Sequence, residues 1–225
     1  MLHEGLGCIT QWSDIPDRLH DTTGLPVVIY DRSGYGRSSS GPSSYGPDFM
    51  YEEANHTLPD LLDLLAIKEP VLVGHSDGGT IGLLAAASGR VPATAVITIA
   101  AHIFVEQVCL NGVREITRRR GQMLAGMARH HNAPAATFDR WSDVWLDPEF
   151  AKFDMRGQLS KIKCPLLVLQ GDRDEYATVE MIHGITRRVP HVIGRFIAEC
   201  GHIAHRDQPE LVVAELTNFL NDILQ

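Results

Sequence analysis

One serine stands in a glycine-rich turn that could expose it as a nucleophile. Ser76 follows the apolar run 71–73, and the small and apolar residues 80–87 come after it, so the segment indicates strand, sharp turn and helix. Gly74-His75-Ser76-Asp77-Gly78 fits the pattern Gly-x-Ser-x-Gly, in which the turn presents the hydroxyl at a helix N-terminus. The alternative interpretation is a glycine-rich strand-to-helix turn with an incidental serine.

A base and an acid for that serine stand later in the chain. A serine hydroxyl is a weak nucleophile until a base removes its proton, and His202 can do this because imidazole titrates near neutral pH. A carboxylate would then orient the imidazole. The turn 171–174 offers Asp172 and Asp174. For Asp172 the other interpretation is a turn residue whose side chain bonds the local backbone.

The elements that must position these residues alternate between strand and helix, which predicts a parallel α/β sheet. Ligands in such sheets bind at the carboxyl ends of the strands. The serine, the acid turn and the histidine each follow an expected strand, so they can share one rim. We expect strands at 27–30, 71–74, 95–100, 165–170 and about 192–198, and helices at 12–19, 49–67, 80–87, about 179–189 and about 209–224.

The stretch 103–157 differs from the rest. It has no strand-like runs, and its helical patterns hold several arginines and the aromatic residues Phe138, Trp141 and Trp145. We interpret it as a helical insertion over the end of the sheet. The predicted organisation is therefore an α/β core, 1–102 and 158–225, with a helical lid at 103–157.

Composition narrows the class of protein. A length of 225 residues suits one domain, and 44% hydrophobic with 21% charged residues is ordinary for a globular protein. The net charge of −8 argues against nucleic acid and anionic membranes as partners. The four cysteines and the His, Asp and Glu residues show no metal or redox spacing. We expect a cytoplasmic protein that acts on a small molecule without cofactor or metal, and leave its oligomeric state open.

Taken in order, these motifs resemble those of the α/β-hydrolase family. Two further segments strengthen the resemblance. His3-Glu4-Gly5-Leu6-Gly7 is similar to the family's oxyanion loop, with Glu4 in place of a common glycine, and Asp31 to Ser38 is similar to its Asp-x-x-Gly-x-Gly-x-Ser segment. A phosphate-binding interpretation of the second segment is weak, because the Gly-Lys-Ser/Thr ending is missing.

The resemblance implies an α/β-hydrolase fold and a set of site residues. The family's Gly-x-x-Asp pattern places the acid at Asp174, with Asp172 as the alternate. The oxyanion hole would use the backbone N–H of Asp77 and that of Gly5 or Leu6. His3, at the start of the loop 3–7, would hold that loop by hydrogen bonds. His75, in the serine turn, would have a packing role. The implied catalytic residues are Ser76, Asp174 and His202.

The implied reaction is hydrolysis of a carboxylic ester or a related acyl bond through an acyl-enzyme. A serine at 76 argues against the aspartate-nucleophile branches, while lactonases and C–C bond hydrolases of ring-fission products share the same three residues. A non-catalytic binding protein on the same fold is the hypothesis from another class.

Substrate contacts are expected from Asp77, Trp141 and Trp145. The Ser-Asp-Gly-Gly run is similar to that of biphenyl-hydrolase-like esterases, a group that includes hydrolases of amino-acid esters. Asp77 could attract a cationic substrate group, or it could simply favour a helix N-terminus. For the histidines at 102, 130 and 131 we expect surface or capping roles, with contact to substrate as the alternative.

The start of the chain raises one more expectation. In the resembled fold, a central strand precedes the oxyanion loop and lies between the strands at 71–74 and 27–30. Only Met1 and Leu2 precede His3, and a missing central strand leaves buried N–H and C=O groups unpaired. We therefore expect an N-terminally shortened version of a longer protein. The alternatives are that the two neighbouring strands close up, or that another chain supplies the strand.

Overall fold

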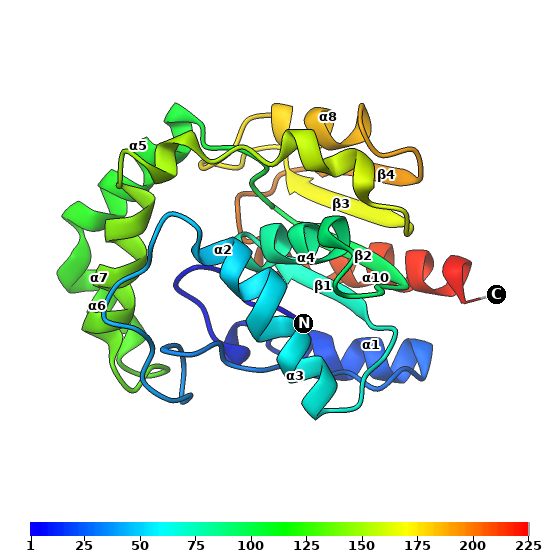
Figure 1. The fold of residues 1–225 in the computed structure, drawn as a ribbon, viewed down its shortest axis with the longest axis horizontal. Helices are drawn as coiled ribbons and strands as arrows, with labels where there is room; N and C mark the ends of the chain where they lie inside the picture. The colour runs from blue at the N-terminus through cyan, green and yellow to red at the C-terminus, as the bar shows by residue number, and fades with distance from the viewer. Residues whose placement is uncertain (225) are drawn as a thin grey trace.

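A parallel sheet between two layers of helices forms the body of the molecule (Figure 1). The computed structural model describes residues 1–224. All neighbouring strands are parallel, in the order β1-β2-β3-β4. Their bounds are β1 Val71–His75, β2 Ala95–Ile99, β3 Leu166–Gly171 and β4 Val192–Ile197. The strands expected at these four places and the α/β class are therefore confirmed.

Helices cover both faces of this sheet. One layer contains the helix that follows β1 and the helix that follows β3, together with the stretch before β1. These are α4 Asp77–Ser88, α8 Glu180–Thr186, α2 Phe49–Glu52 and α3 Leu58–Leu64. The other layer pairs α1 Ile15–Thr23 with α10 Pro209–Ile223. Within the described residues, no helix is long and apolar enough to cross a membrane.

Two hydrophobic cores result from the alternation of side chains along the strands. Leu166 and Val168 of β3 point into the core beneath α4, whereas Leu167 and Leu169 point into the core beneath α1 and α10. A strand that buries both faces is a continuous apolar run, which is why β1, β2 and β3 could be predicted from sequence.

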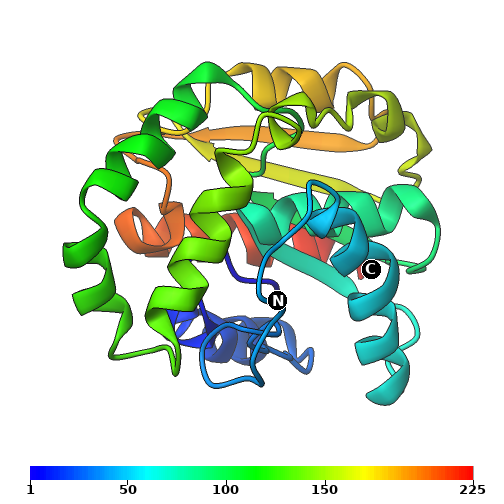
Figure 2. The ribbon, with the colours of Figure 1, turned by 60° about the vertical axis from the view of Figure 1, so that its left-hand side comes forward.

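The segment 103–157 forms an arc of helices beyond the carboxyl ends of the strands, apart from the sheet (Figures 1 and 2). Its elements are α5 Gln107–Arg118, α6 Arg120–Met127, α7 Pro134–Trp145 and the short η3 Phe150–Lys152; η4 Arg156–Lys161 returns to pack against α4. This arc and the rim of the sheet enclose the candidate site.

The helix expected at 49–67 is interrupted near Pro59. A π-helical turn, η2 Glu53–Thr57, lies between α2 and α3. Proline has no N–H to donate to the carbonyl four residues earlier, and its ring crowds that carbonyl. The carbonyl concerned is that of Asn55, and the Arg90 side chain donates to it instead (3.2 Å).

The expected strand at 27–30 is wrong. Residues 25–32 form no strand, and Val28 is 40% exposed. A strand needs a neighbour to pair with, and between this segment and β1 lies only the short stretch 1–2. Leu2 pairs with Gly74 as a single bridge, while the amino group of Met1 donates to the carbonyl of Val28 (2.6 Å). The two flanking segments do not close up and pair with each other among the described residues.

Candidate active site

The turn between β1 and α4 holds Ser76 in a strained conformation. Its φ of 51° and ψ of −119° lie in a region that L-residues rarely adopt. The turn is tight enough to require glycine on both sides. A Cβ at Gly74 would lie 2.2 Å from the carbonyl oxygen of Gly78, and one at Gly78 would lie 2.2 Å from that of Leu2. The result is a hydroxyl at the rim of the sheet, at the N-terminus of α4.

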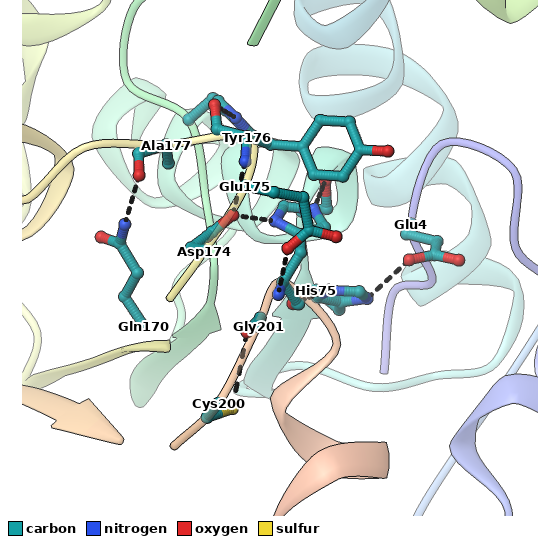
Figure 3. A network of polar contacts seen from close by, with 12 residues as sticks. Glu4, His75, Gln170, Asp174, Glu175, Tyr176, Ala177, Cys200 and Gly201 are labelled. Carbon is teal, nitrogen blue, oxygen red and sulfur yellow. Dashed lines mark hydrogen bonds and ion pairs between the residues drawn. The ribbon is translucent and has the colours of Figure 1, made fainter. Parts of the chain in front are cut away.

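Three side chains meet there in one chain of hydrogen bonds. Asp174 Oδ1 lies 2.9 Å from His202 Nδ1, and His202 Nε2 lies 3.0 Å from Ser76 Oγ. A carboxylate can only accept, so Nδ1 donates to it and Nε2 is left to accept the serine proton. Asp174 Oδ1 also accepts the backbone N–H of Tyr176 (2.9 Å; Figure 3).

Asp172 takes no part in these hydrogen bonds. Its Oδ1 accepts the backbone N–H of Cys200 at 3.2 Å, a contact between the two loops that follow β3 and β4. The sequence left both carboxylates as candidates; of the two, only Asp174 faces His202 in the structure.

Burial and the hydrogen bond between His202 and Asp174 have opposite effects on the pKa values of both side chains. Burial lowers the pKa of His202, but the hydrogen bond and negative charge of Asp174 outweigh it, so the pKa is raised above its ordinary value. Burial likewise raises the pKa of Asp174, and the contact with His202 outweighs that and lowers it. The acid therefore stays ionised near neutral pH, and the imidazole is a stronger base than a free one.

The loop 3–7 lies against the serine with backbone N–H groups to spare. His3 fastens it, because its Nε2 accepts the backbone N–H of Arg32 (3.1 Å) and its Nδ1 donates to the carbonyl of Glu4 (2.8 Å). Neither Gly5 nor Leu6 donates its N–H to a hydrogen bond within residues 1–224. A Cβ at Gly5 would lie 2.0 Å from Trp141 Nε1, so only glycine lets the loop approach this closely.

Glu4 and His75 form a close pair next to the serine turn, which the sequence did not predict; the His75 side chain is 1% exposed and that of Glu4 14%. Glu4 Oε2 lies 3.0 Å from His75 Nδ1 (Figure 3), and His75 Nε2 lies 2.9 Å from the carbonyl oxygen of His202. Each ring nitrogen of His75 thus lies within about 3 Å of an oxygen. Burial raises the pKa of Glu4, but the charge and hydrogen bond of His75 outweigh it, and the pKa is lowered. The expectation that His75 only packs is wrong.

A small cavity of about 140 Å³ adjoins the hydrogen-bonded chain. Its lining includes Ser76, Asp77, Trp141 and Trp145, so the structure brings the expected substrate-contact residues to one place. Asp77 is almost fully buried, and its Oδ2 has no hydrogen-bond partner among the described residues. Burial raises the pKa of Asp77 to about 6, against the opposing effect of Arg32.

The remaining histidines hold loops or line the cavity. His102 lines the cavity, and burial lowers its pKa to about 4. His131 accepts the backbone N–H of Gly36 (3.0 Å), which ties α6 and α7 to the glycine-rich loop 31–38. His130 is exposed and contacts the Thr10 hydroxyl (3.0 Å).

Two residues near His202 also escaped sequence reasoning. The carboxylate of Glu175 accepts the backbone N–H of His202 (3.1 Å), and the ring of Tyr176 lies 4.8 Å from the imidazole. The glutamate within the oxyanion loop was the one available signal for an ion pair in the site, since a charged residue in a buried loop needs a partner. Its partner could not be read from spacing.

The fold and the order of the motifs agree with one known family of proteins. The family model described as "Alpha/beta hydrolase family" matches residues 2–215, and the chain belongs to that family. The fold agrees with that of a thermophilic esterase from Thermogutta terrifontis, with a TM-score of 0.74, 20% identity and coverage of 99% of this chain and 88% of the esterase chain.

Two curated relatives are similar in sequence. Serine hydrolase BPHL of Homo sapiens is 27% identical over 159 residues, which cover 66% of this chain and 53% of the human protein. Esterase YbfF of Escherichia coli is 25% identical over 201 residues, which cover 81% of this chain and 79% of the esterase. The chain thus spans about half the length of the human relative. These relatives support hydrolase activity in general terms.

Proposed function

We propose that the protein is a serine hydrolase that cleaves a carboxylic ester, or a related acyl bond, through an acyl-enzyme. The observation that carries the proposal is the chain of hydrogen bonds from Asp174 through His202 to Ser76, beside a loop with unused N–H groups. The serine hydrolase and esterase among the relatives support the same reaction class.

In the proposed mechanism, Ser76 Oγ attacks the carbonyl carbon of the substrate while its proton moves to His202 Nε2. The charge on the carbonyl oxygen is stabilised by the backbone N–H of Asp77, the first residue of α4, and by that of Gly5 or Leu6. When the C–O bond breaks, His202 gives the proton to the leaving oxygen. Water then attacks the acyl-enzyme while His202 accepts its proton. When the bond between the acyl carbon and Ser76 Oγ breaks, His202 gives that proton to Oγ, and the acid is released.

The lining of the cavity supports a proposed position for the acyl group of the substrate. The acyl group would enter the cavity between Asp77 and the indoles of Trp141 and Trp145. We further propose that 103–157 acts as a lid, because α5 and α7 contribute several of the residues that close this cavity against solvent. Sealing the site from water would strengthen the electrostatic interactions inside it.

A fluorophosphonate probe tests the proposal, because it reacts with an activated serine. We expect labelling of the full chain, loss of labelling in Ser76→Ala, and retention in Ser88→Ala, which alters a hydroxyl that bonds only within α4 and its end. A folded protein that is not labelled would favour the non-catalytic binding protein. Acyl, lactone and dienoic substrates, compared in wild type and Ser76→Ala, would then separate esterase, lactonase and C–C hydrolase.

A further inference from the structure

A second, larger hollow continues from the candidate active site. This outer groove has a volume of about 720 Å³ and lies between α6, the loop 3–14 and the segment after His202. Glu4, Leu6, Met123 and Ile203 line both the outer groove and the catalytic cavity, so the two spaces are adjacent.

The position of the outer groove relative to His202 determines which part of a substrate it could take. In acyl transfer to a serine, the histidine hands its proton to the leaving oxygen, so the leaving group must lie on the side of that ring. Ile203, His205 and Arg206 directly follow His202 and line the outer groove. The His202 ring lines the catalytic cavity, and Ile203 lines both this cavity and the outer groove. Asp77 and Trp145 line only the catalytic cavity, where the acyl group would fit.

The outer groove has a basic rim in an acidic protein. The chain carries a net charge of −8, yet residues 114–131 hold five arginines and one carboxylate, Glu115. Arg119 and Arg129 from this stretch line the outer groove, and Arg206 lines it from α9 Ala204–Asp207.

Two of these arginines have no acidic partner. Among residues 1–224, no ion pair includes Arg129 or Arg206, and the pair of Arg119 with Glu115 is long, at 3.9 Å. Of the two carboxylates in the outer groove, Glu4 is already paired with His75. Asp14 is the other, so cationic groups outnumber free carboxylates there.

Apolar side chains line the groove between these charges. Leu6, Met123, Met127 and Ile203 contribute apolar surface next to the catalytic cavity. Such a groove matches a leaving group with an apolar body attached to the scissile oxygen and an anionic group farther out, within reach of the arginines.

We propose that the outer groove binds the leaving group, and that the preferred substrates are esters of an alcohol or phenol that carries a carboxylate or a phosphate. This inference rests on the proposed serine hydrolase activity and specifies its substrate class. The arginines would hold the anion in both the ester and the transition state, so the preference would appear mainly in KM.

Three acetyl esters with the same acyl group test the inference: 4-acetoxybenzoate, 4-acetoxyphenyl phosphate and the neutral 4-acetoxybenzamide. Each kcat/KM is divided by the rate of alkaline hydrolysis, which removes differences in intrinsic reactivity. At low salt we expect a preference of about five- to tenfold for one or both anionic esters, as two partly exposed charge contacts can supply. The comparison between the two anions tells which group the groove takes.

Two matched double variants distinguish binding by arginines in the outer groove from a general effect of the protein's charge. Arg129→Gln/Arg206→Gln should bring the ratio of anionic to neutral ester close to one. Arg114→Gln/Arg118→Gln removes the same charge from arginines outside the outer groove and should keep the ratio. A wild-type ratio near one, or an equal loss in both double variants, would overturn the inference.

Calorimetry with the Ser76→Ala protein keeps this test separate from the proposed function. If none of the three esters is hydrolysed by wild type, the hydrolase proposal fails for this class, but binding remains measurable. We expect 4-acetoxybenzoate or 4-acetoxyphenyl phosphate to bind at least fivefold more tightly than the benzamide, and Arg129→Gln/Arg206→Gln to remove the difference. Equal affinities, or no binding by any of the three, would reject the groove as an anion site.

Discussion

Asp174 and Asp172 stand two residues apart in one turn, yet they face different partners. The first contacts His202 Nδ1 and the second the backbone of Cys200. Asp174→Asn should therefore lower kcat for an activated ester by about 10⁴-fold, because an amide would favour the wrong imidazole tautomer. Asp172→Asn, which removes only a local contact, should cost less than about tenfold. Steady-state kinetics on p-nitrophenyl acetate would show it, and a larger effect of Asp172→Asn would contradict the assignment of the acid.

Asp77 has a backbone that the proposed mechanism needs and a side chain that it does not. Its carboxylate is buried in the cavity beside Ser76, and Oδ2 has no hydrogen-bond partner among the described residues, so a cation on the acyl group would find an opposite charge there. We expect an α-amino ester to be preferred over its uncharged analogue, and Asp77→Asn to remove that preference.

The pH dependence gives a second check on Asp77. With a pKa of about 6, the carboxylate becomes neutral as the pH falls below 6, so KM for the amino ester should rise there relative to the uncharged ester. Because both esters need the same His202, dividing one by the other cancels its titration. Equal KM values for both esters at all pH values, or an equal effect of Asp77→Asn on both, would leave Asp77 as a helix N-terminal residue only.

At the scale of elements, the Glu4–His75 pair joins three segments that must keep their relative positions. Glu4 belongs to the oxyanion loop, His75 is the last residue of β1, and the carbonyl that His75 contacts belongs to the loop after β4. A hydrogen bond to a charged group contributes about 1.5–3 kcal/mol to stability. Glu4→Gln should therefore lower the free energy of unfolding by that amount, and Glu4→Gln/His75→Asn by less than the sum of the two single changes.

The same pair should be visible in the pH profile. The negative charge of Glu4 helps to raise the pKa of His202. Because only the neutral imidazole can accept the serine proton, kcat/KM falls as the pH drops through that pKa, and Glu4→Gln should move the fall to lower pH. A pair that acts only through packing would lower the rate without moving the profile. Glu175→Gln should move the fall in the same direction, because the charge of Glu175 also raises the pKa of His202. Asp172→Asn, which removes a loop contact to the backbone of Cys200, is the control.

Elements could be predicted from sequence where burial alone fixes them. The strands at 71–75, 95–99 and 166–171 are buried apolar runs. Such a run predicts a strand without knowledge of which strands lie beside it. The run at 27–30 has a similar composition, but a strand also needs a partner at its edge, and only Leu2 lies beside β1 there. The serine, the histidine and the acid turn were found because each follows a strand. The Glu4–His75 pair was not, because it depends on how the loop 3–7 meets the end of β1, which is distant in sequence.

At the scale of the whole molecule, stability depends on two hydrophobic cores, one on each face of the sheet. The candidate active site lies at the carboxyl ends of the strands, outside the core beneath α1 and α10. The core beneath α1 and α10 lies on the face opposite α4, and it includes Trp12, Ile15 and Leu216. Changes in it should alter stability without altering the hydrogen-bonded chain of the candidate site. This separation allows stability and activity to be tested independently.

Leu216 and Leu64 provide a matched pair for that test, since each is a leucine within a helix. Leu216 is fully buried between α10 and the sheet, whereas Leu64 is 82% exposed at the end of α3. Leu216→Ala should lower the free energy of unfolding by about 2–5 kcal/mol, through lost transfer energy and the cavity left behind. Leu64→Ala should stay within about 0.5 kcal/mol of wild type. Urea denaturation followed by circular dichroism measures both, and equal effects of the two changes would mean that α10 is not part of the folding core. At low urea, where both variants are folded, kcat for an ester should match wild type, because neither leucine touches the site.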